Sequence, residues 1–205
     1  MLKAIGISGS LRKASSNTGL LRYAQTVMPA GMTLDLVDIA QVPLFNADLG
    51  DAETLPAVSA VLRRIGDADA LVLAVPEYNY SVAPALKNVL DWASRAPGNQ
   101  LLKGKPVALM GAAGGMGSSR AQYHLRQTCV FLDLLPLNKP EVFANAYAGF
   151  SADGDPVDPV IQDNVRAQME ALLGWTRRLQ GDENSRARTG VELSAAHTPL
   201  AIAAA

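Results

Sequence analysis

The 205-residue sequence predicts one α/β domain, in which a parallel β-sheet carries helices on both faces. Three observations predict it. Apolar segments of strand length alternate with longer segments of helical period, and this alternation repeats about five times. The composition, with 49% hydrophobic and 18% charged residues, is ordinary for a globular protein with a sizeable core. Because a strand–helix–strand connection joins parallel strands, the repeat indicates a parallel sheet.

The expected strands are short segments rich in small and branched apolar residues. The run 70–75 is continuously apolar, as in a strand buried on both faces, whereas 32–39 alternates between apolar and polar residues. The last strand is interrupted at its edges by Pro136 and Pro140. In chain order, the expected strands are Leu2–Ser8, Met32–Ile39, Ala70–Val75, Val107–Met110 and one within Leu134–Phe143.

The longer segments between these strands repeat apolar residues at helical intervals. The first of them places Leu20, Leu21 and Ala24 on one face. Five strands favour a flavodoxin-like, doubly wound five-stranded parallel sheet over a larger six-stranded dinucleotide-binding domain. The expected helices are Asn17–Met28, Leu55–Ile65, Ala83–Ala93, Ser118–Leu132 and Val160–Leu179.

We expect this flavodoxin-like domain to span residues 1–180. From Gly181 onward the sequence becomes polar and then alanine-rich, and its hydrophobic periodicity stops. Residues 181–205 are therefore expected to form a C-terminal tail that is mobile or that packs on a partner chain.

Charge and cysteine content argue against several classes of protein. The sequence holds 18 Lys and Arg against 19 Asp and Glu, which is a formal net charge of -1. This balance argues against nucleic acid or a membrane surface as a partner, and against a strongly acidic electron carrier. Cys129 is the single cysteine, which excludes an intramolecular disulfide and a zinc cluster, and its apolar neighbours predict a buried thiol. No metal site is expected.

The cytoplasm is the expected location of the protein. The N-terminus runs directly into the apolar segment Leu2–Ile7 without a cleavable signal pattern. No apolar run approaches the roughly 20 residues that are needed to span a bilayer.

Ligands of an open parallel sheet bind beyond the carboxyl ends of the strands, where the strand order reverses. This rule points to the loops after the first, third and fourth expected strands, which are also the most unusual loops of the sequence. The loop after the first strand collects hydroxyls, an amide and two cations just before a helix. Its candidate binding residues are Ser10, Arg12, Ser15, Ser16 and Asn17.

The hydroxyls, the guanidinium and the start of the following helix together predict a phosphate site. A simpler interpretation is that one of Ser15, Ser16 and Asn17 caps the helix, but that leaves the other polar groups unexplained. The loop has neither the Gly-Lys-Ser/Thr ending of a Walker loop nor the G-x-G-x-x-G fingerprint of a dinucleotide site. The monophosphate of a mononucleotide therefore fits it best.

The loop after the third strand begins with Pro76, Glu77, Tyr78 and Asn79. Asn79 and backbone groups are suited to the edge of a planar heterocycle, with Tyr78 against its face or rim. The alternative is an ordinary turn, in which Asn tolerates unusual backbone angles. Glu77 fits a surface or interface salt bridge as well as a ligand contact.

The loop after the fourth strand, 111–117, contains four glycines and two alanines. Such residues let the backbone approach a flat ligand closely. A lone glycine-rich loop is weak evidence. This loop carries more weight because it is the third of the three loops that the sheet rule places at the site. Gly111, Ala112 and Gly114 are its candidate binding residues.

These motifs resemble the NADPH-dependent FMN reductase family, and in particular its branch of bacterial quinone and chromate reductases, which are relatives of the azoreductases. The resemblance rests on 9–12 with Ser15 and Asn17, and on 76–81, and it covers roughly residues 2–180. The first two motifs are highly specific together. Further matching segments are 43–48, 86–92, 122–127 and 138–141.

The resemblance implies a flavodoxin-like fold with tightly held FMN. Its isoalloxazine is expected along Pro76–Asn79. Relatives often carry a hydroxyl residue where this chain has Gly111-Ala112-Ala113, so a flavin contact there is expected from the backbone. The residues expected at the FMN phosphate are Ser10, Arg12, Ser15 and Asn17.

The resemblance also implies the reaction. NADPH or NADH would pass a hydride to the FMN, and the acceptor would then collect the electrons in the same place, in ping-pong order. Quinone, chromate, azo compounds and free flavin are the candidate acceptors. No protein nucleophile or general base is required, so no catalytic residue is named.

The family assembles as dimers and often as pairs of dimers, so a homodimer or homotetramer is expected. Arg120, Tyr123 and Glu141 match positions that meet across the contact between dimers in the branch named above.

Three other classes of function compete with this one. A flavodoxin-type electron carrier would lack its own NAD(P)H-oxidising activity, but such carriers are strongly acidic and their phosphate loop lacks a residue like Arg12. A NAD or nucleotide-sugar enzyme could use Asp35 or Asp38 to hold a ribose, but the glycine fingerprint is missing. A regulatory or scaffold protein without flavin is the third.

Overall fold

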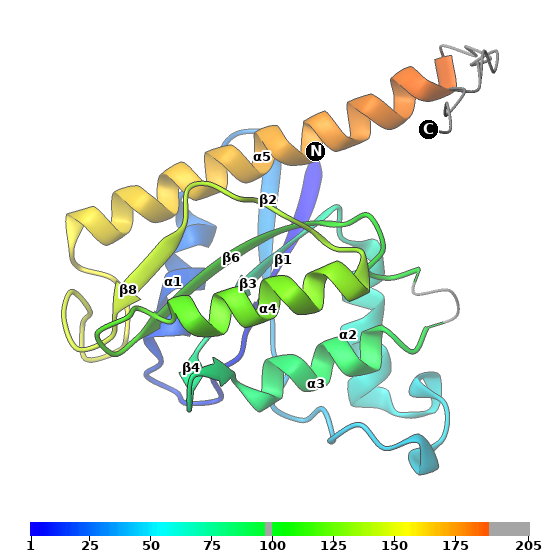
Figure 1. Cartoon of the computed structure of the whole chain (residues 1–205), viewed down its shortest axis with the longest axis horizontal. Helices are drawn as coiled ribbons and strands as arrows, with labels where there is room; N and C mark the ends of the chain where they lie inside the picture. The colour runs from blue at the N-terminus through cyan, green and yellow to red at the C-terminus, as the bar shows by residue number, and fades with distance from the viewer. Residues whose placement is uncertain (97–99, 189–205) are drawn as a thin grey trace, which may run out of the picture.

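The computed structural model describes residues 1–96 and 100–188, with residues 182–188 described by their backbone alone (Figure 1). A parallel sheet lies at the centre, and β2, β1, β3 and β6 follow one another across it. The strands of this sheet are β1 (Leu2–Ser8), β2 (Met32–Val37), β3 (Ala70–Ala74), β6 (Pro106–Ala113), β7 (Leu135–Pro136) and β8 (Val142–Asn145).

This strand order confirms the predicted flavodoxin-like winding, but the expected fifth strand is divided in two. β7 pairs with the start of β6, and β8 pairs with its end, both in parallel. The two segments thus share the fifth position of the sheet, which has six strands. Pro140 lies in the gap between β7 and β8 and favours the division, because a proline has no N–H group to donate to a β-ladder, whereas Pro136 is accommodated within β7.

The five predicted helices are present within two residues of their expected limits, except at the end of the last one. Pro56 and Pro84 each open a helix, where the missing N–H group costs nothing. The helices are α1 (Ser16–Thr26), α2 (Pro56–Asp67), α3 (Pro84–Ala93), α4 (Ser119–Leu132) and α5 (Pro159–Arg188).

The last helix, α5, continues to Arg188, whereas the hydrophobic pattern predicted an end at Leu179. The tail that was expected from residue 181 therefore begins inside this helix. The rest of that tail, 189–205, lies outside the described residues.

The sheet separates two apolar cores. Successive side chains of a strand point to opposite faces, so Ile5 and Ile7 of β1 join the core under α2, α3 and α4, and Ala4 joins the core under α1 and α5. Figure 1 shows α3 and α4 in front of the sheet and α5 running across its upper end. All five residues of β3 are buried, as its continuous apolar run predicted.

Within the described residues, none of the helices is both long and apolar enough to cross a bilayer. The same part of the chain contains no group of three or more His, Cys, Asp or Glu side chains that could hold a metal ion.

Cys129 is a free, fully buried cysteine on α4, as its apolar neighbours predicted. Burial raises the pKa of its thiol from 9.0 to about 12. The folded state therefore keeps the thiol neutral at a pH at which the same thiol ionises in the unfolded chain.

This difference predicts an alkaline loss of stability. The contribution of Cys129 is complete below the unfolded pKa and is lost as pH rises towards the folded pKa. Between about pH 9 and pH 11, the free energy of unfolding should fall more steeply in the wild type than in Cys129→Ala, by up to about 1.4 kcal/mol per pH unit. Denaturant titrations at each pH measure the two slopes. Equal slopes would mean that the thiol ionises freely in the fold.

Candidate functional site

A hollow of about 220 Å³ lies where the carboxyl ends of β1, β3, β6 and β8 meet. Because these strands are parallel, the loops that follow them emerge at one edge of the sheet. Ten of the twelve predicted site residues line the hollow, and Asn79 and Gly111 do not. The ten are Ser10, Arg12, Ser15, Ser16, Asn17, Pro76, Glu77, Tyr78, Ala112 and Gly114.

The loop after β1 brings hydroxyl groups to the start of α1. Ser15 is the N-cap residue, and its Oγ accepts a hydrogen bond of 3.4 Å from the Thr18 N–H. The N–H groups of Ser16 and Asn17 open the helix and have no acceptor within it, because the helical ladder starts further along. The capping interpretation thus explains Ser15, while the helix start still offers two donors and the positive end of its dipole to an anion.

Asn17 connects this helix start to the neighbouring strand. Its Nδ2 donates to the carbonyl of Ala112 at 2.8 Å, and its Oδ1 accepts from the Ala112 N–H at 3.0 Å. The side chain is buried, so this reciprocal pair is shielded from water. The side-chain amide of Asn17 therefore connects the start of α1 to the end of β6. The backbone N–H of Asn17 remains available to a phosphate.

Arg12 supplies the positive charge of the site. It lies on the exposed part of the loop, and none of the acidic side chains in the described part of the chain forms a salt bridge with it. A guanidinium without an internal partner, beside three hydroxyls and a helix start, is suited to bidentate contact with a phosphate.

The loop after β3 folds into a tight hairpin between β4 (Glu77–Tyr78) and β5 (Ser81–Val82). Its two turn residues, Asn79 and Tyr80, have φ of 50° and 68°, the left-handed geometry of a two-residue hairpin turn. Asn79 thus occupies a position that the turn itself requires, and it is exposed outside the hollow. Its contact with a heterocycle stays a prediction.

Glu77 anchors this hairpin to α4. Its carboxylate accepts hydrogen bonds from Arg120 Nε at 2.6 Å and from the Ala121 N–H at 3.5 Å, and its side chain is only 6% exposed. Arg120 in turn lies 3.7 Å from the centre of the Tyr80 ring. The hydrogen bond to Glu77 raises the pKa of Arg120 above its ordinary value. The salt bridge considered for Glu77 from the sequence is therefore present, within one chain.

The loop after β6 forms a wall with few side chains. Gly111 packs so closely that a Cβ there would lie 2.1 Å from Ser118 Oγ and 2.6 Å from the carbonyl oxygen of Val75. A Cβ on Gly114 would meet nothing nearer than 3.7 Å, and one on Gly115 nothing within 4 Å. The first glycine is thus needed for packing, and the later ones leave the backbone open to a flat ligand.

The structure adds three residues that the sequence analysis missed, namely Ala113, Ala146 and Tyr147. The last two follow β8, and the Ala146 N–H donates to the carbonyl of Ala113 at 2.7 Å. The rule that ligands gather at the carboxyl ends of strands applies to this strand too. The sequence analysis did not apply this rule to β8, because it placed one strand somewhere within 134–143 and did not locate where that strand ends.

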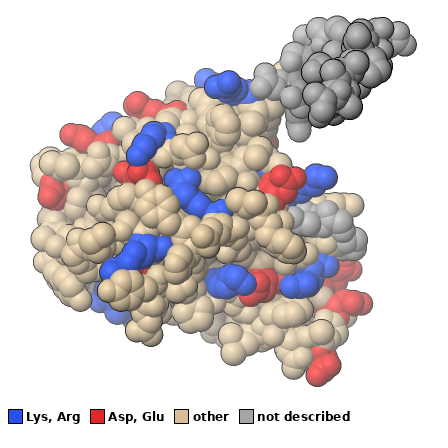
Figure 2. Space-filling view, viewed as in Figure 1, with Lys and Arg blue, Asp and Glu red and all other residues tan. Residues whose placement is uncertain are grey.

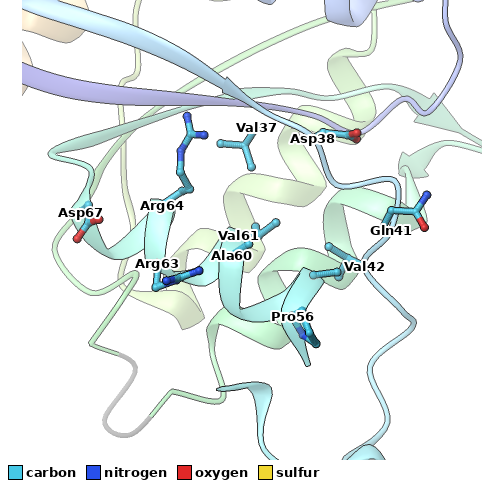
Figure 3. Close-up of a pocket in the computed structure, with 11 residues that line it drawn as sticks. Val37, Asp38, Gln41, Val42, Pro56, Ala60, Val61, Arg63, Arg64 and Asp67 are labelled. Atoms are coloured by element: carbon cyan, nitrogen blue, oxygen red, sulfur yellow. The ribbon is translucent and has the colours of Figure 1, made fainter. Parts of the chain in front are cut away.

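A larger groove of about 700 Å³ lies between the end of β2 and α2, and Figure 3 shows Arg63, Arg64 and Asp38 among its lining residues. Two of its charged groups already have partners: Arg64 lies 3.7 Å from Asp35, and Asp38 accepts a hydrogen bond from the Ala40 N–H. This is where a ribose-binding acid of a dinucleotide enzyme would lie. Because the glycine fingerprint is missing after β1, we place the functional site at the smaller hollow.

Comparison with known proteins agrees with this geometry. A family model described as NADPH-dependent FMN reductase matches residues 2–149. An NAD(P)H-dependent FMN reductase of Pseudomonas aeruginosa is 50% identical over 182 residues, which cover 88% of this chain and 98% of the relative. A quinone reductase of Escherichia coli is 40% identical over 185 residues, with 87% and 97% covered.

Among solved structures, the flavoenzyme FerB of Paracoccus denitrificans, an NAD(P)H:acceptor oxidoreductase, superimposes with a TM-score of 0.78. It is 29% identical to this chain, and the match covers 87% of this chain and 98% of FerB.

The position of Arg12 predicts its effect on FMN. Arg12→Ala should raise the dissociation constant for FMN by about tenfold to a hundredfold, because a hydrogen bond to a charged group contributes about 1.5–3 kcal/mol. Fluorescence titration of the apoprotein with FMN measures it. Lys13→Ala is the matched control, since Lys13 is a neighbouring exposed cation that does not line the hollow. If both variants bind FMN like the wild type, Arg12 has no part in the phosphate site.

Proposed function

Since this chain belongs to the NADPH-dependent FMN reductase family and is an oxidoreductase, we propose that it passes electrons from NAD(P)H through bound FMN to quinones. Chromate, azo compounds and free flavin are further candidate acceptors. The observation that carries the proposal is the composition of the hollow. A free guanidinium, three hydroxyls and a helix start lie beside a glycine wall that is open to a planar ring.

The residues of the hollow fit both ends of FMN. Ser10, Arg12 and Ser15, with the first N–H groups of α1, form a donor set suited to a phosphate dianion. The backbone around Gly114, together with the side chains of Pro76 and Tyr78, offers contacts to the isoalloxazine. We propose that these groups hold the cofactor.

When bound, FMN supplies the redox chemistry by accepting a hydride from NAD(P)H and returning two electrons to the acceptor. The ionisable groups that line the hollow are Arg12, Glu77, Tyr78 and Tyr147. Of these, Glu77 is committed to Arg120. The proposed tasks of the chain are therefore to bind the phosphate, to orient the ring and to leave one face of it accessible. No residue is assigned as a general acid or base.

Both NADPH and NADH stay candidate electron donors, because the lining of the hollow contains no second cation beside Arg12 for a 2′-phosphate. The cytoplasm is the proposed location, because NAD(P)H is available there.

An absorption spectrum of the purified protein tests this function. We expect flavin bands that bleach on anaerobic addition of NADPH or NADH and return on addition of a quinone. Bands that do not bleach with either nucleotide would support an electron carrier instead. A protein without flavin bands, even after incubation with FMN, would contradict the proposal.

We also propose that the protein forms a homodimer or homotetramer, with Arg120, Tyr123 and Glu141 at a subunit contact. Within one chain, Tyr123 Oη donates to Glu141 Oε1 at 2.9 Å, and Arg120 is bound to Glu77. The hydrogen bond to Glu141 raises the pKa of Tyr123, and the hydrogen bond from Lys139 lowers the pKa of Glu141. Within a single chain, Tyr123, Lys139 and Glu141 thus form one hydrogen-bonded cluster, and Arg120 with Glu77 forms a separate pair.

The surface around this cluster supports a protein contact. Val130 and Phe131 at the end of α4 are 81% and 85% exposed, and the ring of Phe143 lies 6.2 Å from that of Tyr123. Figure 2 shows charges of both signs scattered over this side of the molecule, with uncharged surface between them. Exposed apolar side chains beside a hydrogen-bonded polar cluster are typical of a subunit interface.

The double variant Tyr123→Phe with Glu141→Gln tests this contact. It should lower the mass measured by sedimentation at micromolar protein, because the hydrogen bond and the charge of the cluster are removed while its volume is kept. The control is Tyr23→Phe, whose hydroxyl also has a partner, Arg166, but lies on α1 at the opposite face of the sheet. An unchanged mass of the double variant would reject the assignment of these residues to an interface.

A further inference from the structure

The loop after β8 presents one tyrosine at the mouth of the hollow. Tyr147 is 89% exposed, yet it lines the hollow together with Tyr78 from the hairpin, which is 49% exposed. A Cβ on Gly114 would lie 3.7 Å from Tyr147 Cε2, so one edge of the phenol ring lies beside the glycine wall. An aromatic ring in this position has one side near the backbone and most of its surface free.

The backbone beneath Tyr147 is held firmly. The Tyr147 N–H donates to Asn145 Oδ1 at 3.0 Å, and the preceding Ala146 N–H is bound to Ala113. These bonds attach the start of the loop to the end of β6. The ring therefore projects from a fixed base.

The far part of the same loop is attached to α1. Arg22 lies 2.6 Å from Asp155 and also donates to the carbonyl of Asp153. A Cβ on Gly19 would lie only 1.8 Å from the Gly154 carbonyl oxygen, so that the loop and the helix are in direct backbone contact. The loop thus spans from the phosphate-binding helix to the glycine wall.

On these grounds we infer that Tyr147 determines substrate binding by stacking on the planar ring of a substrate that enters the hollow. The inference rests on the proposed function, because it presumes a substrate placed against bound FMN. The ring is either that of the quinone-type acceptor or the nicotinamide, since both would use the same space in turn. Stacking on a rigid, exposed phenol stabilises a flat ligand and does little for a compact ion.

Tyr147 is assigned to the substrate and not to the FMN phosphate. The donors suited to the phosphate come from the loop after β1, and Tyr147 lies at the glycine wall, beyond the carboxyl end of β8. Substitution of Tyr147 should consequently leave the affinity for FMN unchanged.

Calorimetric titrations of the oxidised, FMN-loaded protein test the inference without turnover. One arm uses 1,4-naphthoquinone and the other uses NADP⁺, which carries the nicotinamide but cannot reduce the flavin. Tyr147→Ala should raise the dissociation constant in at least one arm by about threefold to tenfold, and Tyr147→Phe should stay within about twofold of the wild type. The arm that changes identifies the ring that stacks.

Two controls separate stacking from other effects. Leu44→Ala removes an exposed apolar side chain that neither lines the hollow nor belongs to the proposed subunit contact, and it should change neither titration. The rate at which the reduced enzyme reduces hexacyanoferrate(III), a compact octahedral ion, should be the same in Tyr147→Ala and in the wild type. The affinity of the apoprotein for FMN should also be unchanged.

Several outcomes would overturn the inference. One is a Tyr147→Ala protein that binds both probes like the wild type. Another is equal weakening by Tyr147→Phe, which would assign the effect to the hydroxyl. Parallel losses of FMN affinity and hexacyanoferrate reduction would assign Tyr147 to the cofactor. Failure of the wild type to oxidise NAD(P)H would reject the proposed function, but the titrations would still test Tyr147, because they need no turnover.

Discussion

The parallel direction of the sheet strands is the constraint on which the rest of this structure depends. It sends the loops after β1, β3, β6 and β8 to one edge, although the first of these strands ends at Ser8 and the last at Asn145. One reciprocal hydrogen-bonded pair, between the Asn17 side chain and the Ala112 backbone, then fixes two of these loops at the right separation. In the described part of the chain, this pair is the direct hydrogen-bonded connection between the start of α1 and the glycine wall.

The site has two chemically different halves because its loops come from different strands. The half from β1 is rich in hydroxyls and carries Arg12, a cation that forms no salt bridge within the described residues, so it suits an anion. The half from β6 and β8 has little side-chain volume apart from Tyr147, so it suits a flat ring. This division suits a family of FMN reductases, in which the cofactor supplies the chemistry. The protein then has to bind and orient the cofactor, and it does not have to transfer protons.

The hairpin after β3 connects this site to the surface of α4. Glu77 lies at the hollow and at the same time holds Arg120, which packs on Tyr80 at the tip of the turn. Arg120 lies one helical turn from Tyr123, at the surface proposed for subunit contact. A change in that contact therefore has a short physical route to the hairpin, through a single buried carboxylate.

The sequence by itself determined the fold class, the helices and ten of the residues that line the hollow. It could do so because hydrophobic period and the chemistry of loop residues are local properties of the chain. Only the tertiary structure decided that the side chain of Asn17 binds Ala112, that Glu77 is paired with Arg120, and that Tyr147 joins the site. Each of these depends on contacts between segments that are far apart in the chain. A local sequence pattern does not specify such contacts, because the order of the strands in the sheet decides which distant segments become neighbours.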